Sequence, residues 1–449
     1  MKKNYFYIIM IPLMVLTTGF IILRFNNKEQ ASVNRSYQFQ KRKAESSIDK
    51  EWAYLNGQTE AHLDKLRLNP SDNKSKLALA SIFIGEARAY GNHAYYDEAA
   101  MYYVDAVLSS DPKNFEASIL KCVLLLSQHR FEEALVEGEK TKELNPYNAF
   151  VYGILIDANV ELGKYDSAVV NSDKMVGVRP DIRSYSRIAY LREIYGDYPG
   201  AIEAMKMAVE AGTPGDEATA WTRVQLARLY ENTGELSYAK MQYEQALVDK
   251  PNYAYALSGK GKLLLNDKKT EEAIKYLLQA DALVEDGSVK ELLAEAYQQN
   301  GDIKKASNLQ NEIINSINNH QHATNTKQAG HYHAGMELAY AYLNVGKNED
   351  ALRSALIEYK RRPANIDVNE CMAWVLYKNG EHAKAFPYLQ KALSTSSKQP
   401  RLLCRAALIY QANGMAAKAS GMFSQALINQ PLIDPILKES CKQLLSLGL

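Results

Sequence analysis

Ten alanines recur along most of the chain at nearly constant spacing. Consecutive members of the series are separated by 35, 34, 33, 38, 34, 33, 45, 34 and 34 residues. Such a period is typical of tandem helix-turn-helix units, each of which buries its apolar face against its neighbours. The spacing therefore predicts one long array, built to hold other molecules, in place of several globular domains. The ten residues are Ala99, Ala134, Ala168, Ala201, Ala239, Ala273, Ala306, Ala351, Ala385 and Ala419.

Two further positions are fixed relative to each alanine. Twelve residues before it stands a mostly small residue, such as Ala189, Ala227 or Ala294, which lets two antiparallel helices approach closely. Five residues before it stands a glycine in most units, such as Gly163 or Gly234, which supplies the left-handed conformation that ends the first helix. A proline often follows the second helix and stops it.

The segments 149–180 and 220–251 show this pattern in full, as AFVYGILIDANVELGKYDSAVVNSDKMVGVRP and AWTRVQLARLYENTGELSYAKMQYEQALVDKP. They closely resemble the tetratricopeptide repeat, and the resemblance covers roughly residues 76–431. It implies an all-α, right-handed superhelical solenoid of about ten units, whose first helices line a concave groove that holds an extended or helical partner peptide. Readers of chaperone tails in this family clamp a carboxylate with a lysine and asparagines. That pattern does not recur here, which disfavours a cochaperone.

Other segments are expected at both ends of the array and within it. Capping helices are expected because the exposed faces of terminal repeats would be sticky. The predicted organisation is a membrane anchor or signal segment at 1–25, a basic juxtamembrane stalk at 26–46, an N-terminal capping helix at 47–75, units 1–7 at 76–319, a histidine-containing insertion at 320–331, units 8–10 at 332–431 and a C-terminal capping helix at 432–449.

Residues 4–23 form an uncharged, largely apolar run. At about 1.5 Å per residue, a helix of this length reaches across a hydrocarbon core of roughly 30 Å. We interpret it as an uncleaved transmembrane helix, with a cleaved signal peptide as the alternative. Lys2 and Lys3 favour a cytoplasmic amino terminus, whereas Arg24 and Lys28 favour cytoplasmic repeats. The short lead favours export, so we predict a single-pass membrane protein with periplasmic or extracytoplasmic repeats.

Counting helical positions from the small residues places a strip of side chains in the concave groove. The strip is basic in the middle units, acidic next at Glu291 and Glu295, and aromatic toward the carboxyl end. Arginine and aromatic side chains are common interface anchors, so the strip is predicted to hold a partner peptide with acidic and then apolar residues. The alternative for each residue is packing between units. The candidates are Arg183, Arg187, Tyr190, Trp221, Arg228, Asn232, Tyr255, Lys262, Tyr340, Trp374 and Tyr377.

The step of 45 residues contains four of the eight histidines of the chain, His320, His322, His331 and His333. Neutral imidazoles at this spacing in a polar loop could chelate a divalent metal such as zinc, nickel or copper. The alternative is a solvated polar loop, because no fixed zinc-site spacing is matched. Apart from this possible metal, the sequence predicts no cofactor.

The remaining features exclude several classes of protein. The chain has 53 basic and 52 acidic residues, so no global field favours nucleic acid. It has no phosphate-binding loop, HExxH or GxSxG motif, and we expect no enzymatic activity. Its four cysteines lack CxxC spacing and are expected to be core residues. The leading hypothesis is a membrane-tethered protein-protein interaction scaffold; the alternatives are a metal-binding accessory protein and a scaffold that associates with itself.

Overall fold

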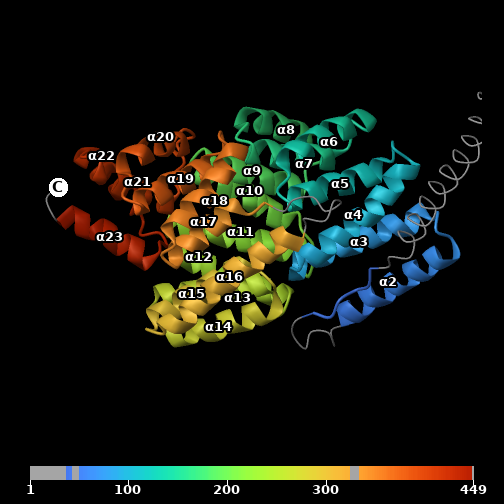
Figure 1. Cartoon of the computed structure of the whole chain (residues 1–449), viewed down its shortest axis with the longest axis horizontal. Coiled ribbons are helices and arrows are strands. Elements are labelled where there is room, and N and C mark those ends of the chain that lie inside the picture. Colours follow the sequence, from blue (N-terminus) through green and yellow to red (C-terminus); the bar gives the residue numbers. More distant parts are fainter. Residues whose placement is uncertain (1–36, 43–49, 324–332, 447–449) are drawn as a thin grey trace, which may run out of the picture.

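The computed structural model describes residues 37–42, 50–323 and 333–446, and it shows an all-α helical repeat solenoid (Figure 1). In the described part of the chain, ten antiparallel helix pairs run from α3 to α22, with α2 before them and α23 after them. The first half comprises α2 (Lys50–Leu68), α3 (Asn73–Tyr90), α4 (His93–Ser110), α5 (Phe115–Ser127), α6 (Phe131–Leu144), α7 (Ala149–Glu161), α8 (Tyr165–Val178), α9 (Ile182–Ile194), α10 (Tyr198–Glu210), α11 (Glu217–Thr233) and α12 (Leu236–Asp249). The second half comprises α13 (Ala254–Asn266), α14 (Thr270–Leu283), α15 (Gly287–Gln299), α16 (Ile303–Ala323), α17 (Gly335–Asn344), α18 (Asn348–Arg361), α19 (Ile366–Lys378), α20 (His382–Ala392), α21 (Pro400–Ala412), α22 (Ala416–Ala426) and α23 (Pro435–Ser446).

The recurring alanines lie inside the helix pairs. Ala134 and Ala239 are fully buried, and the most exposed of the ten, Ala306, is only 8% exposed. At Gly261, an added Cβ would lie 2.7 Å from Cγ of Leu277, so the small residue of the first helix permits the close approach of the second. The four cysteines are free and buried, as the sequence predicted; they are Cys122, Cys371, Cys404 and Cys441.

Each first helix ends in a left-handed residue, which reverses the chain. Gly163 has a φ of +71°, and the backbone N–H of Lys164 donates to the carbonyl of Asn159 at 2.8 Å. This bond satisfies a carbonyl that the helix end would otherwise leave unpaired. His129 and Lys268 adopt the same conformation without glycine, with φ of +56° and +60°. The predicted role of the turn glycines is therefore confirmed, and two pairs achieve it at a steric cost.

The array turns back on itself, so that helix pairs far apart in the sequence lie side by side (Figure 1). The turn inside each of the first five pairs contacts a connector that follows one of the last five pairs. At the third of these contacts, hydrogen bonds join residues 201 to 205 positions apart. We call this line of contacts the seam; it joins Gly91 to Glu285, His129 to His333, Gly163 to Ala364, Gly196 to Ser396 and Gly234 to Asn429.

The seam brings backbone against backbone at the turn glycines. An added Cβ at Gly163 would lie 2.7 Å from the backbone nitrogen of Asn365, and one at Gly234 would lie 2.7 Å from the carbonyl carbon of Asn429. By contrast, an added Cβ at Gly380 would meet nothing within 4 Å. In four of the first five pairs, glycine therefore serves both the left-handed turn and the contact between successive turns of the solenoid.

A buried ion pair lies at the middle of the seam. The side chain of Arg362, the residue that follows α18, is 5% exposed and pairs with Glu161 of α7 and with Glu358 of α18. Next to it, Asn365 Nδ2 donates to the carbonyl of Glu161 at 3.0 Å. The Tyr165 hydroxyl accepts a hydrogen bond of 2.9 Å from the backbone N–H that follows Asn365. A buried charge is tolerated where hydrogen bonds satisfy it, and these contacts fix the register of the two turns.

The predicted juxtamembrane stalk needs a correction over residues 37–42. These residues are extended and pack against α3 and α4, with Tyr37, Phe39 and Arg42 each at most 8% exposed. An extended segment can bury side chains two positions apart on one face, as it does at Tyr37 and Phe39, so this part is not a solvated spacer. The rest of the predicted stalk, residues 26–36 and 43–46, lies outside the described residues.

The predicted localisation is also corrected. Within residues 37–42, 50–323 and 333–446, no helix is long and apolar enough to cross a membrane, which contradicts a single-pass membrane protein with exported repeats. The apolar helix α7 has only 13 residues, and at about 1.5 Å per residue it falls short of a hydrocarbon core. The run at 4–23 on which the prediction rested lies outside the described residues.

The seam predicts a difference between two chemically identical substitutions. Gly163→Ala and Gly380→Ala both place a Cβ at a positive φ, which costs about 1 kcal/mol. Only Gly163→Ala also overpacks the seam, which adds about 2 kcal/mol. Urea unfolding should therefore show a loss of about 3 kcal/mol for Gly163→Ala and about 1 kcal/mol for Gly380→Ala. Equal losses would show that the two solenoid turns do not touch at Gly163.

Candidate functional site

The first helices of successive pairs contact one another in a row, and many of the predicted groove residues lie along it. Arg187 of α9 binds Asp157 of α7 through two hydrogen bonds, of 2.8 and 2.6 Å. Lys262 of α13 donates to Glu231 of α11 at 2.7 Å. Both cations are therefore paired with a carboxylate of the preceding first helix, which agrees with the alternative that these residues pack between units.

Glu231 is the acceptor of a buried cluster. It is 1% exposed, and the Tyr243 hydroxyl donates to its second oxygen at 2.7 Å. The neighbouring Asn232 donates from Nδ2 to Glu193 of α9 at 3.1 Å. Such pairs satisfy polar groups where first helices meet, and they hold adjacent units in register.

The aromatic end of the strip is organised around Arg405 of α21. Its guanidinium carbon lies 5.0 Å from the ring centre of Tyr340 and 4.9 Å from that of Trp374. It donates to Glu370 at 2.7 Å and to the Tyr340 hydroxyl at 3.0 Å. Trp374 in turn stacks on Tyr377 with a centroid distance of 5.2 Å. The three predicted aromatic residues are thus brought together, and two of them, Tyr340 and Trp374, lie against an arginine of the chain itself.

Two further predicted aromatic residues also have contacts within the chain. The Tyr255 hydroxyl donates to Asp286 at 3.0 Å. Trp221 is half-buried and lies 6.0 Å from the guanidinium of Arg88. These contacts leave less of either residue available to a ligand than the sequence pattern suggested.

Three predicted groove residues remain exposed on the row. Tyr190 is 41% exposed. Arg228 is exposed, and its contact to Gln225 of the same helix is 3.5 Å long. Arg183 is exposed, with its guanidinium 5.0 Å from the ring centre of Phe150. These side chains come from α9 and α11 and form the available part of the predicted strip.

Carboxyl groups from both turns of the solenoid surround Tyr190. Burial raises the pKa of Glu161 of α7 and of Glu193 of α9 to about 7, and the charge of Asp367 adds to both shifts. Burial and the charge of Glu370 raise the pKa of Asp367 itself, on α19, to about 6. Although 41% of the Tyr190 side chain is exposed, desolvation inside the concave face and these carboxylates raise the pKa of its hydroxyl well above the ordinary value. The charged forms of these three carboxyl groups are therefore disfavoured at this part of the inner face.

Sequence reasoning missed Glu161, Asp367, Glu370 and Arg405. Each lies on a first helix, but the repeat pattern gives no register for contacts between turns of the solenoid, and Glu161 meets Asp367 only across the seam. The positions of these charges on the first helices were the available signal. The repeat pattern does not show how many units make one superhelical turn, and this number decides which of these charges meet.

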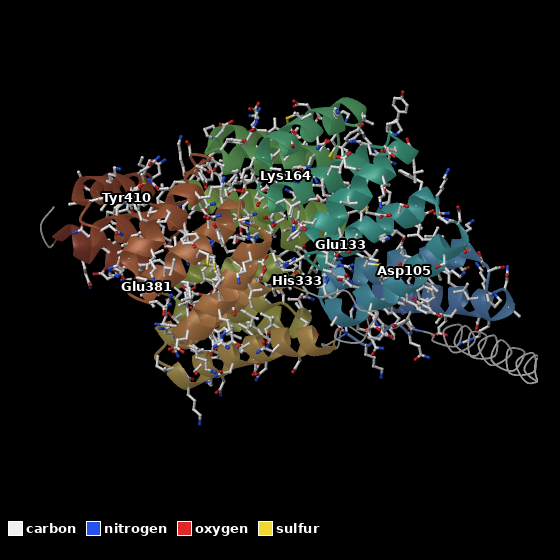
Figure 2. The ribbon with its side chains drawn as sticks, turned by 45° about the horizontal axis from the view of Figure 1, so that its top comes forward. Asp105, Glu133, Lys164, His333, Glu381 and Tyr410 are labelled. Carbon is white, nitrogen blue, oxygen red and sulfur yellow. The ribbon has the colours of Figure 1, made fainter. Side chains whose placement is uncertain are left out.

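The histidine cluster is only partly described. Helix α16 continues to Ala323, so His320 and His322 belong to a helix and not to a loop, which corrects the predicted insertion at its start. His331 lies outside the described residues. The carbonyl of His333 lies 2.5 Å from Nδ1 of His129, where the two solenoid turns meet (Figure 2). Among the residues searched, no group of three or more His, Cys, Asp or Glu side chains could hold a metal, and the metal site stays a prediction.

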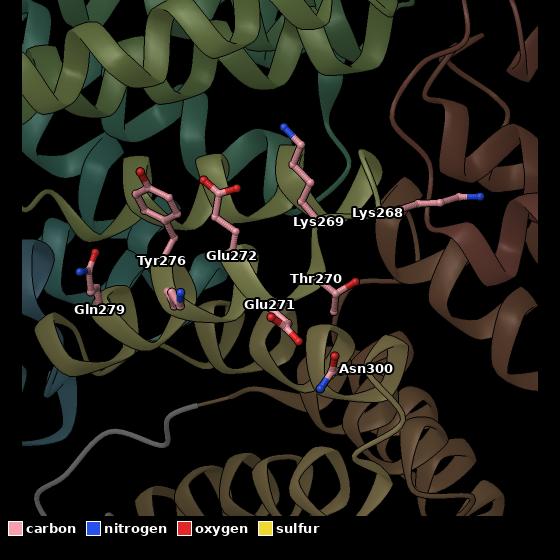
Figure 3. A pocket seen from close by; sticks show the side chains of 9 residues that line it. Lys268, Lys269, Thr270, Glu271, Glu272, Tyr276, Gln279 and Asn300 are labelled. Carbon is pink, nitrogen blue, oxygen red and sulfur yellow. The ribbon is translucent and has the colours of Figure 1, made fainter.

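A shallow hollow of about 960 Å³ lies along α14 (Figure 3). Its lining combines lysine and glutamate side chains of α14 and the preceding turn with Asn300. Most of these residues are exposed, and none belongs to the predicted strip. Ligand sites are usually enclosed and largely apolar, so this hollow is a weak candidate.

Comparison with protein families matches residues 224–288 and 336–400 to the tetratricopeptide repeat. The chain is similar, with 23% identity over 353 residues, to a tetratricopeptide-repeat-containing protein of Methanocaldococcus jannaschii; the match covers 71% of this chain and 57% of that protein. It is also similar, with 35% identity over 99 residues, to the Hsp70-Hsp90 organizing protein of Triticum aestivum, over 21% of this chain and 17% of that protein. The chain thus spans less than two thirds of either relative.

Among solved structures, a thermophilic tetratricopeptide-repeat protein of Thermus thermophilus matches with a TM-score of 0.36 and 22% identity, over 41% of this chain and 98% of that chain. The family match supports a tetratricopeptide-like repeat, and proteins of this kind generally mediate protein-protein interactions and are typically not enzymes. The prediction that this chain does not read chaperone tails stays a prediction.

The raised pKa values predict a pH dependence of stability. Folding raises the pKa of Glu193 from 4.5 to about 7, so the folded state binds this proton more tightly than the unfolded state. The free energy of unfolding should therefore fall as pH rises from about 4.5 through about 7. Urea midpoints measured across this range should fall less in Glu193→Gln than in the wild type. Glu203→Gln, at an exposed position on α10, is the control and should keep the full fall. Equal pH profiles for the two variants would contradict the assignment.

Proposed function

We propose that this chain is a protein-interaction scaffold that holds a segment of a partner protein along the row of first helices, at α9 and α11. One observation carries the proposal: Arg183, Tyr190 and Arg228 remain exposed on this row, whereas most of the other predicted residues contact the chain itself. Tyrosine and arginine side chains are frequent anchors of interfaces, which supports this assignment.

The charges around Tyr190 support a partner segment of mixed charge. A lysine or arginine opposite Tyr190 would favour the charged forms of Glu161, Glu193 and Asp367, whose pKa values are raised by desolvation and by neighbouring carboxylates. It would also gain a cation-π contact with the Tyr190 ring. Acidic residues on either side would pair with the arginines of the strip. The proposed partner is therefore an extended segment with one basic residue between acidic ones.

The spacing of the helices sets the spacing of these residues in the partner. Packed helices lie about 8–10 Å apart, and an extended chain advances about 3.3 Å per residue. The residue that contacts Tyr190 on α9 and the one that contacts Arg228 on α11 are therefore about three positions apart. Arg187 and Lys262 position the row, because their pairs with Asp157 and Glu231 hold neighbouring first helices together.

Site-specific photo-crosslinking tests this proposal. A benzophenone amino acid is placed at position 190 on α9 or, as a matched control, at position 238 on α12. Both positions carry tyrosine, with 41% and 53% exposure, but only the first lies on the row of first helices. In the source cells, we expect one discrete adduct from position 190 and none from position 238.

A second substitution separates specific recognition from chance proximity. Arg228→Ala should reduce the adduct at position 190 by about tenfold, because truncation of an interface arginine commonly costs more than 1 kcal/mol. Lys240→Ala, which removes an exposed cation on α12, should leave it unchanged. The same adduct from both photoreactive positions, or equal effects of the two alanine variants, would reject the proposed contact surface.

A further inference from the structure

A short extended segment at the amino-terminal end of the solenoid lies in a groove between helices. We call residues 37–42, YQFQKR, the strap. Its side chains alternate in environment: Tyr37 and Phe39 are buried, whereas Gln38, Gln40 and Lys41 are exposed. It packs against the aromatic face of α3 and α4 and against α2, at the blue end of the molecule (Figure 1).

Tyrosine hydroxyls and an indole bind the backbone of the strap. The backbone N–H of Gln38 donates to the Tyr95 hydroxyl at 3.0 Å, and this hydroxyl donates to the carbonyl of Gln38 at 2.7 Å. The N–H of Gln40 donates to the Tyr96 hydroxyl at 3.0 Å, and Nε1 of Trp52 donates to the carbonyl of Gln40 at 3.0 Å. These bonds hold an extended main chain whatever its side chains are, as a peptide-binding groove does.

Two aromatic side chains of the strap supply apolar contacts. The Tyr37 ring makes an edge contact with the Tyr95 ring at 5.7 Å, and its hydroxyl donates to Glu98 at 2.9 Å. The Phe39 ring packs between Trp52 and Tyr96, with centroid distances of 6.2 and 5.9 Å. Aromatic pairs at such distances contribute about 0.5–1.5 kcal/mol beyond the area they bury.

The third anchor is ionic. Arg42 donates to both oxygens of Glu86, at 2.7 and 2.8 Å, and its guanidinium lies 3.5 Å from the ring centre of Tyr90. Glu86 is only 2% exposed, and without Arg42 its charge would be buried and uncompensated. The groove therefore requires a cation, and a planar bidentate partner is what arginine supplies.

We propose that the groove formed by α2, α3 and α4 is a peptide-binding site for an extended partner segment of the pattern aromatic-x-aromatic-x-x-arginine, which the strap occupies in cis. Tyrosine hydroxyl groups bind the main chain of the segment in one direction. Two aromatic pockets and one buried carboxylate select its side chains. It is separate from Tyr190 on α9 and does not rest on the function proposed above.

The covalent link of the strap to its groove explains how occupancy would be controlled. A tethered segment competes with free ligands at an effective concentration on the order of millimolar. A partner segment of the same pattern therefore gains the groove when it binds more tightly or carries further contacts, or when the strap is modified. Gln38, Gln40 and Lys41 are exposed, so the groove does not select the side chains at these three positions.

The test measures binding of the fluorescein-labelled peptide YQFQKR to the full chain with a vacated groove, Tyr37→Ala/Phe39→Ala/Arg42→Ala. This variant should bind the peptide at least tenfold more tightly than the wild type, in which the strap competes. Peptides with Phe39→Ala or Arg42→Gln should bind at least tenfold more weakly than the parent. A peptide with Lys41→Gln is the matched control and should bind within about twofold of it.

Two results would overturn the proposal: a vacated chain that keeps the helical circular dichroism of the wild type but does not bind the peptide, or equal binding of all four peptides. If the strap instead reaches a second copy, wild-type chain will form concentration-dependent dimers that the vacated variant cannot form. That result would support the groove and identify its occupant as another strap.

A second arm applies if the vacated variant does not fold. A protease recognition sequence replaces residues 44–48 in the otherwise unchanged chain, and the folded protein is cut there. The cut chain should then take up labelled YQFQKR, whereas the uncut chain should not. Failure of the cut, still helical chain to exchange its strap for the peptide would reject the site.

Discussion

Five turns of the first half of the array contact five connectors of the second half, and at four of them backbone meets backbone. The rest of the structure depends on this seam, because the inner face exists in its observed form only when one superhelical turn lies against the next. Glycine permits the approach at Gly163 and Gly234, where no side chain would fit. Arg362 and Asn365 then fix the register through a buried ion pair and hydrogen bonds to the end of α7. The raised pKa of Glu161 follows from the same closure, since desolvation is its largest cause.

Within this frame, the polar side chains of the first helices divide by what they contact. Arg187, Lys262 and Arg405 neutralise carboxylates on neighbouring first helices and so fix the spacing of the units. Within the part of the chain that the structure describes, Tyr190 and Arg228 have no comparable partner on a neighbouring unit, and this difference supports the proposed binding surface. At the amino-terminal end, the strap shows a second mode of recognition in which side-chain hydroxyls bind an extended main chain.

Much of the fold could be predicted from the sequence because its determinants are local. The buried alanines and the left-handed turn glycines recur with the period of one helix pair, and both were found where the pattern placed them. The candidate site was harder to predict. Whether Arg187 is free or paired depends on Asp157 in the preceding unit, and the environment of Tyr190 depends on Asp367 in the next superhelical turn. The strap was missed because six residues of alternating character resemble a solvated linker unless their groove is known.

The seam also constrains how such a chain can change its length. In a solenoid whose turns do not touch, one unit can be duplicated or lost and only its two neighbours must adapt. Here the turn of one pair meets the connector that follows the fifth pair after it, as Gly163 meets Ala364 and Gly234 meets Asn429. Removal of one internal unit would place every later connector against a turn whose residues do not match it. The number of units between the two turns is therefore fixed by geometry, and growth of the array is free only at its ends.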